Sequence, residues 1–131
     1  AGDVRIFAKI ENLQGMEHLK ELLPHCDEIV IARGDLGNAM PLAKLPCAQE
    51  EIADQCRKYG RAFMVVTQML ASMEHRAVPT RAEVSDIFRA VQQGAASVML
   101  TGETAAGNYP LEAMEVLADT VREAETYLAG R

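Results

Sequence analysis

The chain has 131 residues, and 49% of them are hydrophobic. A chain of this length is the size of one domain and can bury a substantial core without disulfides or metal ions. It carries 13 basic and 19 acidic side chains, which gives a net charge of −6. Binding to nucleic acid or to an anionic membrane needs a net basic face, so neither partner is expected.

We expect no targeting segment in these residues. The first five residues lack the basic start of a signal peptide, and no apolar run approaches the ~20 residues of a membrane span. The cysteines Cys26, Cys47 and Cys56 match no disulfide framework and no zinc spacing. We therefore expect reduced thiols and a cytoplasmic protein. The chain begins without Met and enters a strand-like run at once, so we expect a piece of something longer.

Four short apolar runs rich in β-branched residues predict strands at 4–9, 28–32, 63–67 and 97–101. Each run is too short for a helix and is typical of a strand buried on both faces. Segments of helical period separate the runs. The resulting alternation of strand and helix predicts an α/β fold with a parallel sheet.

The predicted helices follow the strands in turn. A short helix is expected from Gly15 to Leu23, before Pro24, and a second one runs from about Leu45 to a glycine cap at Gly60. A capping box at 80–83 opens a third helix that ends near Gly94. A proline at position 110 opens a long final helix. Residues 68–79 show no clear period and are predicted as a loop.

Charged residues follow the first two strands. Glu11 and Asp35 come at corresponding points of successive strand–helix units, where side chains of a parallel sheet converge. Two carboxylates with substrate oxygens and water are the usual ligands of Mg²⁺. Lys9 lies on the same side of its strand as Glu11 and could neutralise charge that develops on a nearby oxygen. Taken singly, each residue is more often part of a solvated strand end or a tight turn.

Other strand ends add polar groups. Gly34 and Gly37 flank Asp35 and would let backbone N–H groups approach a small anion. Thr67 follows the third strand with a hydroxyl group, and the run Thr101-Gly102-Glu103-Thr104 follows the fourth. The common placement of these groups, rather than any single one, indicates a site.

Five of these segments, in this order and spacing, resemble pyruvate kinase. They are Lys9 to Asn12 (KIEN), Ala32 to Gly37 (ARGDLG), Thr67 to Leu70 (TQML), Pro79 to Glu83 (PTRAE) and Met99 to Ala105 (MLTGETA). The similarity covers essentially residues 1–131. It implies four consecutive βα units of a TIM (β/α)₈ barrel, the fifth to eighth, as a partial catalytic barrel domain.

The resemblance also implies residue roles. Lys9 matches the lysine that stabilises the phosphoryl group moving between phosphoenolpyruvate and ADP, and Glu11 and Asp35 match the metal-binding carboxylates. The substrate carboxylate would be held by the loop Ala32, Arg33, Gly34 and Asp35 together with Thr67. Thr101 stands where the family usually has serine, near the group that protonates the enolate, and Glu103 matches a motif glutamate near the floor of the site.

The implied cofactors are Mg²⁺ or Mn²⁺, with K⁺ bound mostly by residues outside this chain. The implied products are pyruvate and ATP, and the family implies a homo-oligomer, a tetramer for the parent enzyme. After Gly37 the family commonly has an acidic residue before the proline, whereas Asn38-Ala39-Met40 precede Pro41 here.

Two alternatives stand beside the kinase. A metal-dependent lyase or aldolase of the phosphoenolpyruvate and pyruvate class could use the same carboxylate pair, although Lys9 and Thr67 favour the kinase. A non-catalytic half-barrel that self-associates is the other. We expect the isolated chain to lack kinase turnover and to dimerise or be marginally stable, because its sheet would have two unpaired edges.

Overall fold

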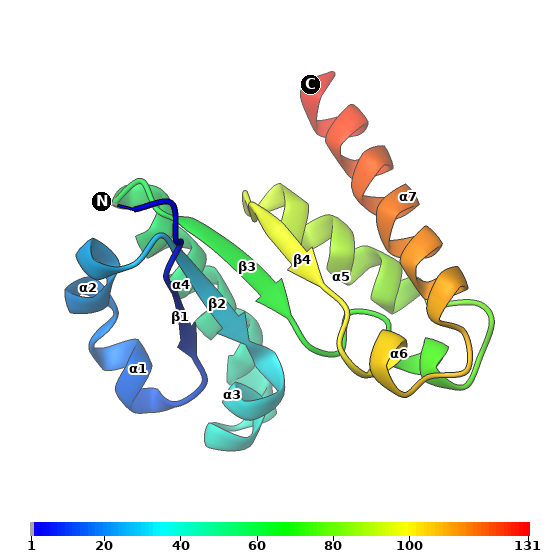
Figure 1. Ribbon diagram of the computed structural model, residues 1–131, viewed down its shortest axis with the longest axis horizontal. Coiled ribbons are helices and arrows are strands. Elements are labelled where there is room, and N and C mark those ends of the chain that lie inside the picture. Colours follow the sequence, from blue (N-terminus) through cyan, green and yellow to red (C-terminus); the bar gives the residue numbers. More distant parts are fainter. Residues whose placement is uncertain (1) are drawn as a thin grey trace. The chain divides into compact units, whose positions relative to one another are not determined.

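The computed structural model describes residues 2–131 as an α/β structure built on one four-stranded sheet (Figure 1). The strand order β1-β2-β3-β4 follows the chain, with helices between successive strands. β1 and β2 are parallel, and Lys9 lies opposite Val30. The predicted parallel sheet of βα units is therefore confirmed. The strands are β1 Phe7–Ile10, β2 Glu28–Ala32, β3 Ala62–Val66 and β4 Ser97–Met99.

The three longest helices occur where the sequence predicts them. They are α4 Leu45–Lys58, α5 Arg81–Gln92 and α7 Pro110–Ala129. The capping box of α5 is formed, and Pro110 occupies the first turn of α7. Gly60 ends α4 with φ 66°; its N–H donates to the Arg57 carbonyl and the next N–H donates to the Cys56 carbonyl. This pair of bonds is a Schellman motif, which needs a left-handed residue at this place.

The single helix predicted from Gly15 to Leu23 is wrong. The segment forms α1 Leu13–Glu17, α2 Leu19–Leu22 and a 3₁₀ turn, η1 Leu23–His25. The break falls at His18, which caps α1 with non-helical backbone angles. Asn12 starts α1 by accepting a hydrogen bond from the N–H of Gly15, which explains its earlier start.

Two short helices and two 3₁₀ turns occur where the sequence indicated loops. They are α3 Arg33–Ala39, η2 Leu42–Lys44, η3 Ala71–Glu74 and α6 Gly102–Ala105. Glycines in α3 and α6 lower helix propensity, which is why a local pattern misses them. Packing compensates, since Leu36 of α3 and Met73 of η3 are fully buried.

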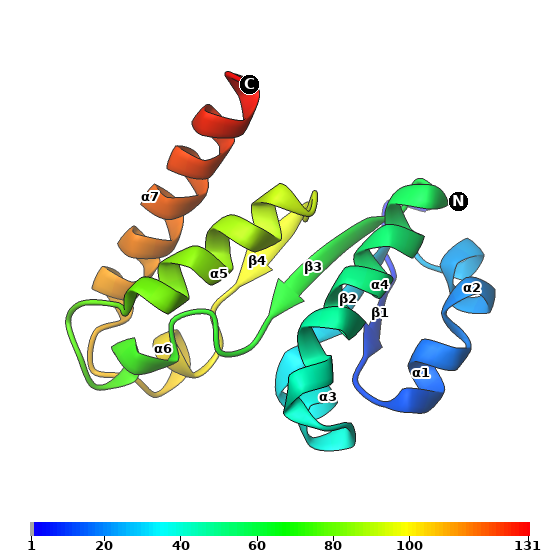
Figure 2. The same cartoon turned by 180° about the vertical axis from the view of Figure 1, so that it is seen from behind.

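The described residues divide into two compact units, and the boundary between them falls within β3 and within β4. Unit 1 contains the chain up to Val65 together with Ala95–Ser97. In this unit α4 packs against β2 and against the helices α2 and α3, and Figure 2 shows α4 across one face of β1 and β2. The most deeply buried apolar residues of unit 1 are exposed by 1% or less: Ile10, Leu23, Ile29, Ile31, Ala32, Leu36, Ile52, Ala53, Cys56, Phe63, Val65.

Unit 2 contains Val66–Gly94 and Val98–Arg131. Its helices α5 and α7 pack side by side, with the rings of Phe88 and Tyr127 6.0 Å apart between centroids. The α6 helix packs on η3 and α7. The fully buried side chains described in this unit are Met69, Leu70, Met73, Ile87, Ala90, Glu103 and Ala113.

The prediction that every strand is buried on both faces holds for β2 but is wrong for β1 and β4. Phe7 in β1 is 43% exposed and Met99 in β4 is 42% exposed. Both strands lie at the ends of the strand order, so each has a neighbour on one side only. Among residues 2–131 fewer side chains therefore surround an edge strand than a central one, and its residues are less completely covered.

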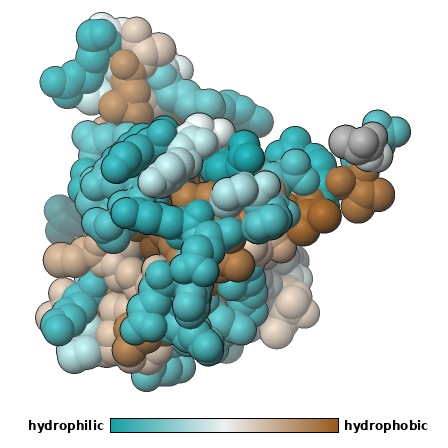
Figure 3. Space-filling view, turned by 90° about the vertical axis from the view of Figure 1, so that its left-hand side faces the viewer, coloured by the Kyte–Doolittle hydropathy of each residue, from teal (hydrophilic) through white to brown (hydrophobic). Residues whose placement is uncertain are grey.

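The surface over the N-terminal helices is mainly hydrophilic, and apolar atoms gather on the extended N-terminal segment (Figure 3). Val4 and Ile6, which lie on this segment, are 84% and 59% exposed. None of the helices among residues 2–131 combines the length and the apolar character needed to cross a membrane.

Candidate functional site at the strand ends

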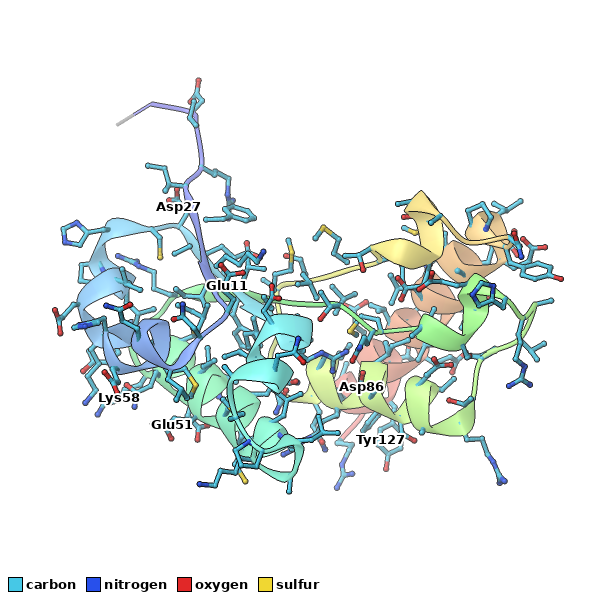
Figure 4. The ribbon with its side chains drawn as sticks, turned by 90° about the horizontal axis from the view of Figure 1, so that it is seen from below. Glu11, Asp27, Glu51, Lys58, Asp86 and Tyr127 are labelled. Carbon is cyan, nitrogen blue, oxygen red and sulfur yellow. The ribbon has the colours of Figure 1, made fainter. Side chains whose placement is uncertain are left out.

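The carboxyl ends of β1 and β2 bring three charged side chains together in unit 1. Lys9 lies in β1 and Glu11 follows it, so side-chain alternation places both on one face while Ile10 is buried on the other. The Nζ of Lys9 lies 3.0 Å from Oε2 of Glu11 and 4.0 Å from Oδ2 of Asp35. Both carboxylates therefore converge on one cationic position. Glu11 is labelled in Figure 4, where it lies at the carboxyl end of β1.

Lys9 and Glu11 shift each other's pKa. The hydrogen bond from Lys9 holds the pKa of Glu11 below its usual range, and the neighbouring Asp35 adds to this. The hydrogen bond and the charge of Glu11 raise the pKa of Lys9. All three side chains are 42% to 61% exposed, so solvent weakens their attraction. The cluster is therefore open to a ligand.

The donor set fits a divalent cation bound with substrate and water. Among residues 2–131, no group of three or more His, Cys, Asp or Glu side chains is placed to hold a metal ion. Glu11 and Asp35 nevertheless present two carboxylates to one position. Mg²⁺ is usually held by one or two carboxylates plus substrate oxygens and water. The pair thus suits an ion whose other ligands come from outside the protein.

The loop predicted around Asp35 is the beginning of a helix. Ala32 precedes α3, and Arg33, Gly34 and Asp35 form its first turn. The side chain of Arg33 is buried, with 8% of the residue exposed. The first turn of a helix directs its N–H groups outward along the axis, in the direction that suits an anion. The segment predicted as a tight turn is thus the first turn of a short helix.

The strand ends of unit 2 hold the remaining predicted residues. Thr67 and Gln68 follow β3 with φ of 70° and 57°, and they are the non-glycine residues with positive φ in the described chain. Thr101 directly precedes α6, and its N–H donates to Oε1 of Glu103 at 2.9 Å. Oε2 of Glu103 accepts from the N–H of Leu70 at 2.8 Å. Glu103 is therefore connected to both strand ends of this unit.

The predicted residues form two sets, one in each unit. Lys9, Glu11 and Asp35 contact one another in unit 1, beside the first turn of α3. Thr101 and Glu103 contact each other in unit 2, and Glu103 binds the segment that begins at Thr67.

Sequence reasoning missed a buried carboxylate at the opposite end of the sheet. Glu28 is 3% exposed; its Oε1 lies 3.5 Å from Nη2 of Arg5, and its Oε2 accepts from Oγ of Ser97 at 2.6 Å. The signal was a charged residue at the start of the apolar run 28–32. At the amino end of the strands such a residue serves stability rather than chemistry.

Parallel βα units with polar side chains at the carboxyl ends of the strands define the chain as a segment of a (β/α)₈ barrel. The family model of the pyruvate kinase barrel domain matches residues 1–114. A pyruvate kinase of Dictyostelium discoideum is 45% identical over 123 residues, which are 94% of this chain and 24% of that protein. One of Bacillus licheniformis is 41% identical over 128 residues, 98% of this chain and 22% of that protein.

A solved structure agrees with the sequence comparisons. A pyruvate kinase from Cryptosporidium parvum superposes with a TM-score of 0.92 at 40% identity, over 95% of this chain and 26% of that one. The chain belongs to the pyruvate kinase family and is a fragment of its barrel domain. It spans about a quarter of the length of these relatives.

Proposed function

We propose that this chain supplies one part of a site that transfers the phosphoryl group of phosphoenolpyruvate to ADP, giving pyruvate and ATP. The observation that carries the proposal is the convergence of Lys9, Glu11 and Asp35 at the ends of neighbouring parallel strands. Family membership supports the kinase over the lyase or aldolase that could use the same carboxylates.

Phosphoryl transfer requires mainly positioning and neutralisation of charge. Glu11 and Asp35 would hold Mg²⁺ or Mn²⁺ between them. When bound, the ion neutralises negative charge on the oxygens of the substrate. The Lys9 ammonium is exposed and lies on a flexible stem, so it can follow the phosphoryl group as charge moves onto it. Lys9 therefore acts as the mobile positive charge of the site.

The remaining roles concern the carboxylate and the enolate of the substrate. Backbone groups of Ala32, Arg33, Gly34 and Asp35, at the start of α3, would bind the substrate carboxylate, with the Thr67 hydroxyl as a further contact. Thr101 would keep the hydroxyl that the family uses near the site of enolate protonation. Their positions at strand ends support these roles.

Membership of the family also suggests further ligands, an oligomeric state and a location, and these belong to the same proposal. K⁺ and the nucleotide would bind mostly through residues outside this chain, and the whole protein would act as a homo-oligomer in the cytoplasm. Size measurement of the whole protein and cell fractionation test the last two points. One relative is named as chloroplastic, which makes fractionation the informative experiment.

Metal affinity tests the carboxylate pair directly in the 131-residue chain. Mn²⁺ binding is measured by electron paramagnetic resonance for wild type, Glu11→Gln and Asp35→Asn. Each substitution removes one of two charged ligands, so each should weaken binding at least about tenfold. Glu51→Gln is the matched control, because Glu51 is an exposed carboxylate on α4, away from these strand ends (Figure 4).

Unchanged Mn²⁺ affinity in both site variants would remove the metal site from the proposal. A lactate dehydrogenase-coupled assay with Mg²⁺, K⁺, phosphoenolpyruvate and ADP then examines turnover. The isolated chain is expected to show none. Turnover that Lys9→Ala abolishes would instead place a complete site within these 131 residues.

A further inference from the structure

The buried carboxylate of Glu103 binds two backbone amides that belong to different strand ends. The residue is 1% exposed. Its Oε2 accepts from the N–H of Leu70 at 2.8 Å, and its Oε1 accepts from the N–H of Thr101 at 2.9 Å. Hydrogen bonds to an ionised acceptor are stronger and shorter than neutral ones. Glu103 thus connects the segment after β3 to the segment after β4.

The segment after β3 adopts an unfavourable backbone conformation. Thr67 and Gln68 have φ of 70° and 57°, and for a β-branched residue such as Thr67 positive φ is a genuine outlier. Conformations of this kind persist where the surrounding structure over-determines them, and they cluster at functional sites. Met69 and Leu70 are fully buried and anchor the segment, and the bond from Leu70 to Glu103 fixes its end.

The helix that carries Glu103 is itself closely packed. A Cβ on Gly102 would lie 2.8 Å from a carboxylate oxygen of Glu74, and one on Gly107 would lie 2.7 Å from the carbonyl oxygen of Glu103. The N–H of Asn108 donates to the Glu74 carbonyl at 2.9 Å. The segment 102–108 thus packs closely against η3, and Glu103 lies within this packed segment.

We propose that Glu103 is a positioning residue. Its carboxylate holds the segment 67–70 in the left-handed conformation and thereby places Thr67 for contact with the carboxylate of a 2-oxo acid. This inference rests on the proposed function, in which Thr67 makes that contact. Both oxygens of Glu103 accept from backbone amides, so this side chain is engaged by the two segments rather than directed at a ligand.

An isosteric substitution separates this role from simple packing. Glu103→Gln keeps the shape but replaces one acceptor oxygen by an NH₂ group, which would face an N–H donor. Either the Leu70 or the Thr101 amide then loses its partner. Gln68→Gly supplies the rescue, because glycine adopts positive φ without steric cost and should reduce the dependence on Glu103.

The experiment uses nuclear magnetic resonance on the 131-residue chain. Glu103→Gln should accelerate amide exchange at Leu70 or Thr101 at least about tenfold and change the coupling constants that report φ of Thr67. In the presence of Mg²⁺ it should weaken pyruvate binding about tenfold, while Mn²⁺ affinity at Glu11 and Asp35 stays unchanged. Adding Gln68→Gly should restore most of the pyruvate affinity.

Glu83→Gln is the matched control, because Glu83 is another carboxylate of unit 2 that binds backbone amides, those of Ser72 and Thr80. It should leave the Thr67 coupling and pyruvate affinity unchanged. The proposal is overturned if Glu103→Gln keeps the wild-type Thr67 coupling. If wild type binds no pyruvate while the Thr67 coupling changes in the variant, the proposed contact of Thr67 with the substrate fails and the role of Glu103 in holding segment 67–70 stands.

Discussion

The ammonium group of Lys9 lies between two carboxylates, so in the absence of a ligand it occupies the charge environment that a divalent cation would use. Its nitrogen is 3.0 Å from Glu11 and 4.0 Å from Asp35. A bound cation would compete with this ammonium for the same oxygens. The charge of Lys9 should therefore lower the affinity of the two carboxylates for a metal ion, whether or not substrate is bound.

Removing the Lys9 charge should therefore strengthen metal binding while removing any phosphoryl transfer. We expect Lys9→Met to raise Mn²⁺ affinity about threefold to tenfold, because the carboxylates lose their internal counter-ion. The same titration on Lys20→Met, an exposed lysine on α2, should show no change. Weaker Mn²⁺ binding in Lys9→Met would contradict this account of the cluster.

The three thiols differ in accessibility and should differ in reactivity. Burial raises the pKa of Cys56 to about 11, and burial likewise raises the pKa of Cys26. Cys47 is exposed. Because the thiolate is the reactive form, iodoacetamide at pH 8 should modify Cys47 at least about tenfold faster than Cys56. Peptide mapping by mass spectrometry measures the three rates, and equal rates would show that the core opens readily.

At the level of elements, the carboxylate of Glu83 joins η3 to the beginning of α5. It accepts from the N–H of Thr80 at 2.9 Å and from the N–H and hydroxyl of Ser72 at 2.8 and 2.5 Å. Burial alone would raise the pKa of Glu83, but the hydrogen bonds from Ser72 and Thr80 outweigh it and lower the pKa. The capping box was predictable from sequence, whereas the contact with Ser72 was not.

This lowered pKa gives the stability of α5 a defined pH dependence. A carboxylate with a depressed pKa stabilises the folded state above its unfolded pKa of ~4.3, and the effect is lost as pH falls through the folded value. Glu83→Gln should cost about 1 kcal/mol at pH 7, typical of a lost cap, and progressively less below about pH 4. Urea unfolding at pH 7 and pH 3 measures both differences.

Glu115→Gln serves as control, since Glu115 is exposed on α7. This substitution should change the free energy of unfolding by the same small amount at pH 7 and at pH 3. A Glu83→Gln effect that is equal at pH 7 and pH 3 would show that charge plays no part in the cap.

Gly107 and Gly60 are required for different reasons. Alanine substitution at each position should distinguish close packing from backbone strain. A Cβ on Gly107 would lie 2.7 Å from the Glu103 carbonyl oxygen, so backbone must move. Gly60 has φ 66°, and no other atom lies within 4 Å of the position that a Cβ would occupy. We expect Gly107→Ala to cost about 2 to 3 kcal/mol by overpacking and Gly60→Ala about 1 kcal/mol by backbone strain. Urea midpoints measure both.

Gly60→Asn provides the distinguishing variant, because asparagine tolerates the left-handed region better than alanine. It should recover part of the stability lost in Gly60→Ala. A Gly60→Asn protein no more stable than Gly60→Ala would argue against backbone strain as the cause.

For the whole molecule, the strand order leaves β1 and β4 as the edges of the sheet. Exposed apolar side chains accompany the β1 edge, with Ile6 59% and Phe7 43% exposed. Unpaired edges and exposed apolar groups favour association with further strands. In a (β/α)₈ barrel four more βα units would cover them.

We expect the 131-residue chain to self-associate at micromolar concentration. Sedimentation velocity should show dimers or larger species, and Ile6→Lys should shift the distribution toward monomer by placing a charge at the edge. Lys44→Glu, an exposed change in η2, should not shift it. A compact wild-type monomer with a sharp unfolding transition would contradict this prediction.

Local pattern was sufficient for the elements whose signals lie within a few residues. The run 28–32, the capping box at Thr80 and the proline at position 110 each act through neighbouring backbone groups, so they could be recognised in order along the chain. The placement of Glu11 and Asp35 at corresponding strand ends could also be predicted from the sequence, because the carboxyl ends of parallel strands lie on the same side of a sheet.

The contacts across longer separations depended on the packed structure. Glu103 reaches an amide 33 residues away, and Glu28 reaches a hydroxyl 69 residues away. The helices α3 and α6 form despite their glycines because Leu36 and Glu103 are buried in the folded units. The linear order of residues thus specified the strands, the caps and the family of this chain. The tertiary structure decided which polar side chains are buried, which groups they bind and which strand faces stay exposed. All three depend on packing between segments that lie far apart in the sequence.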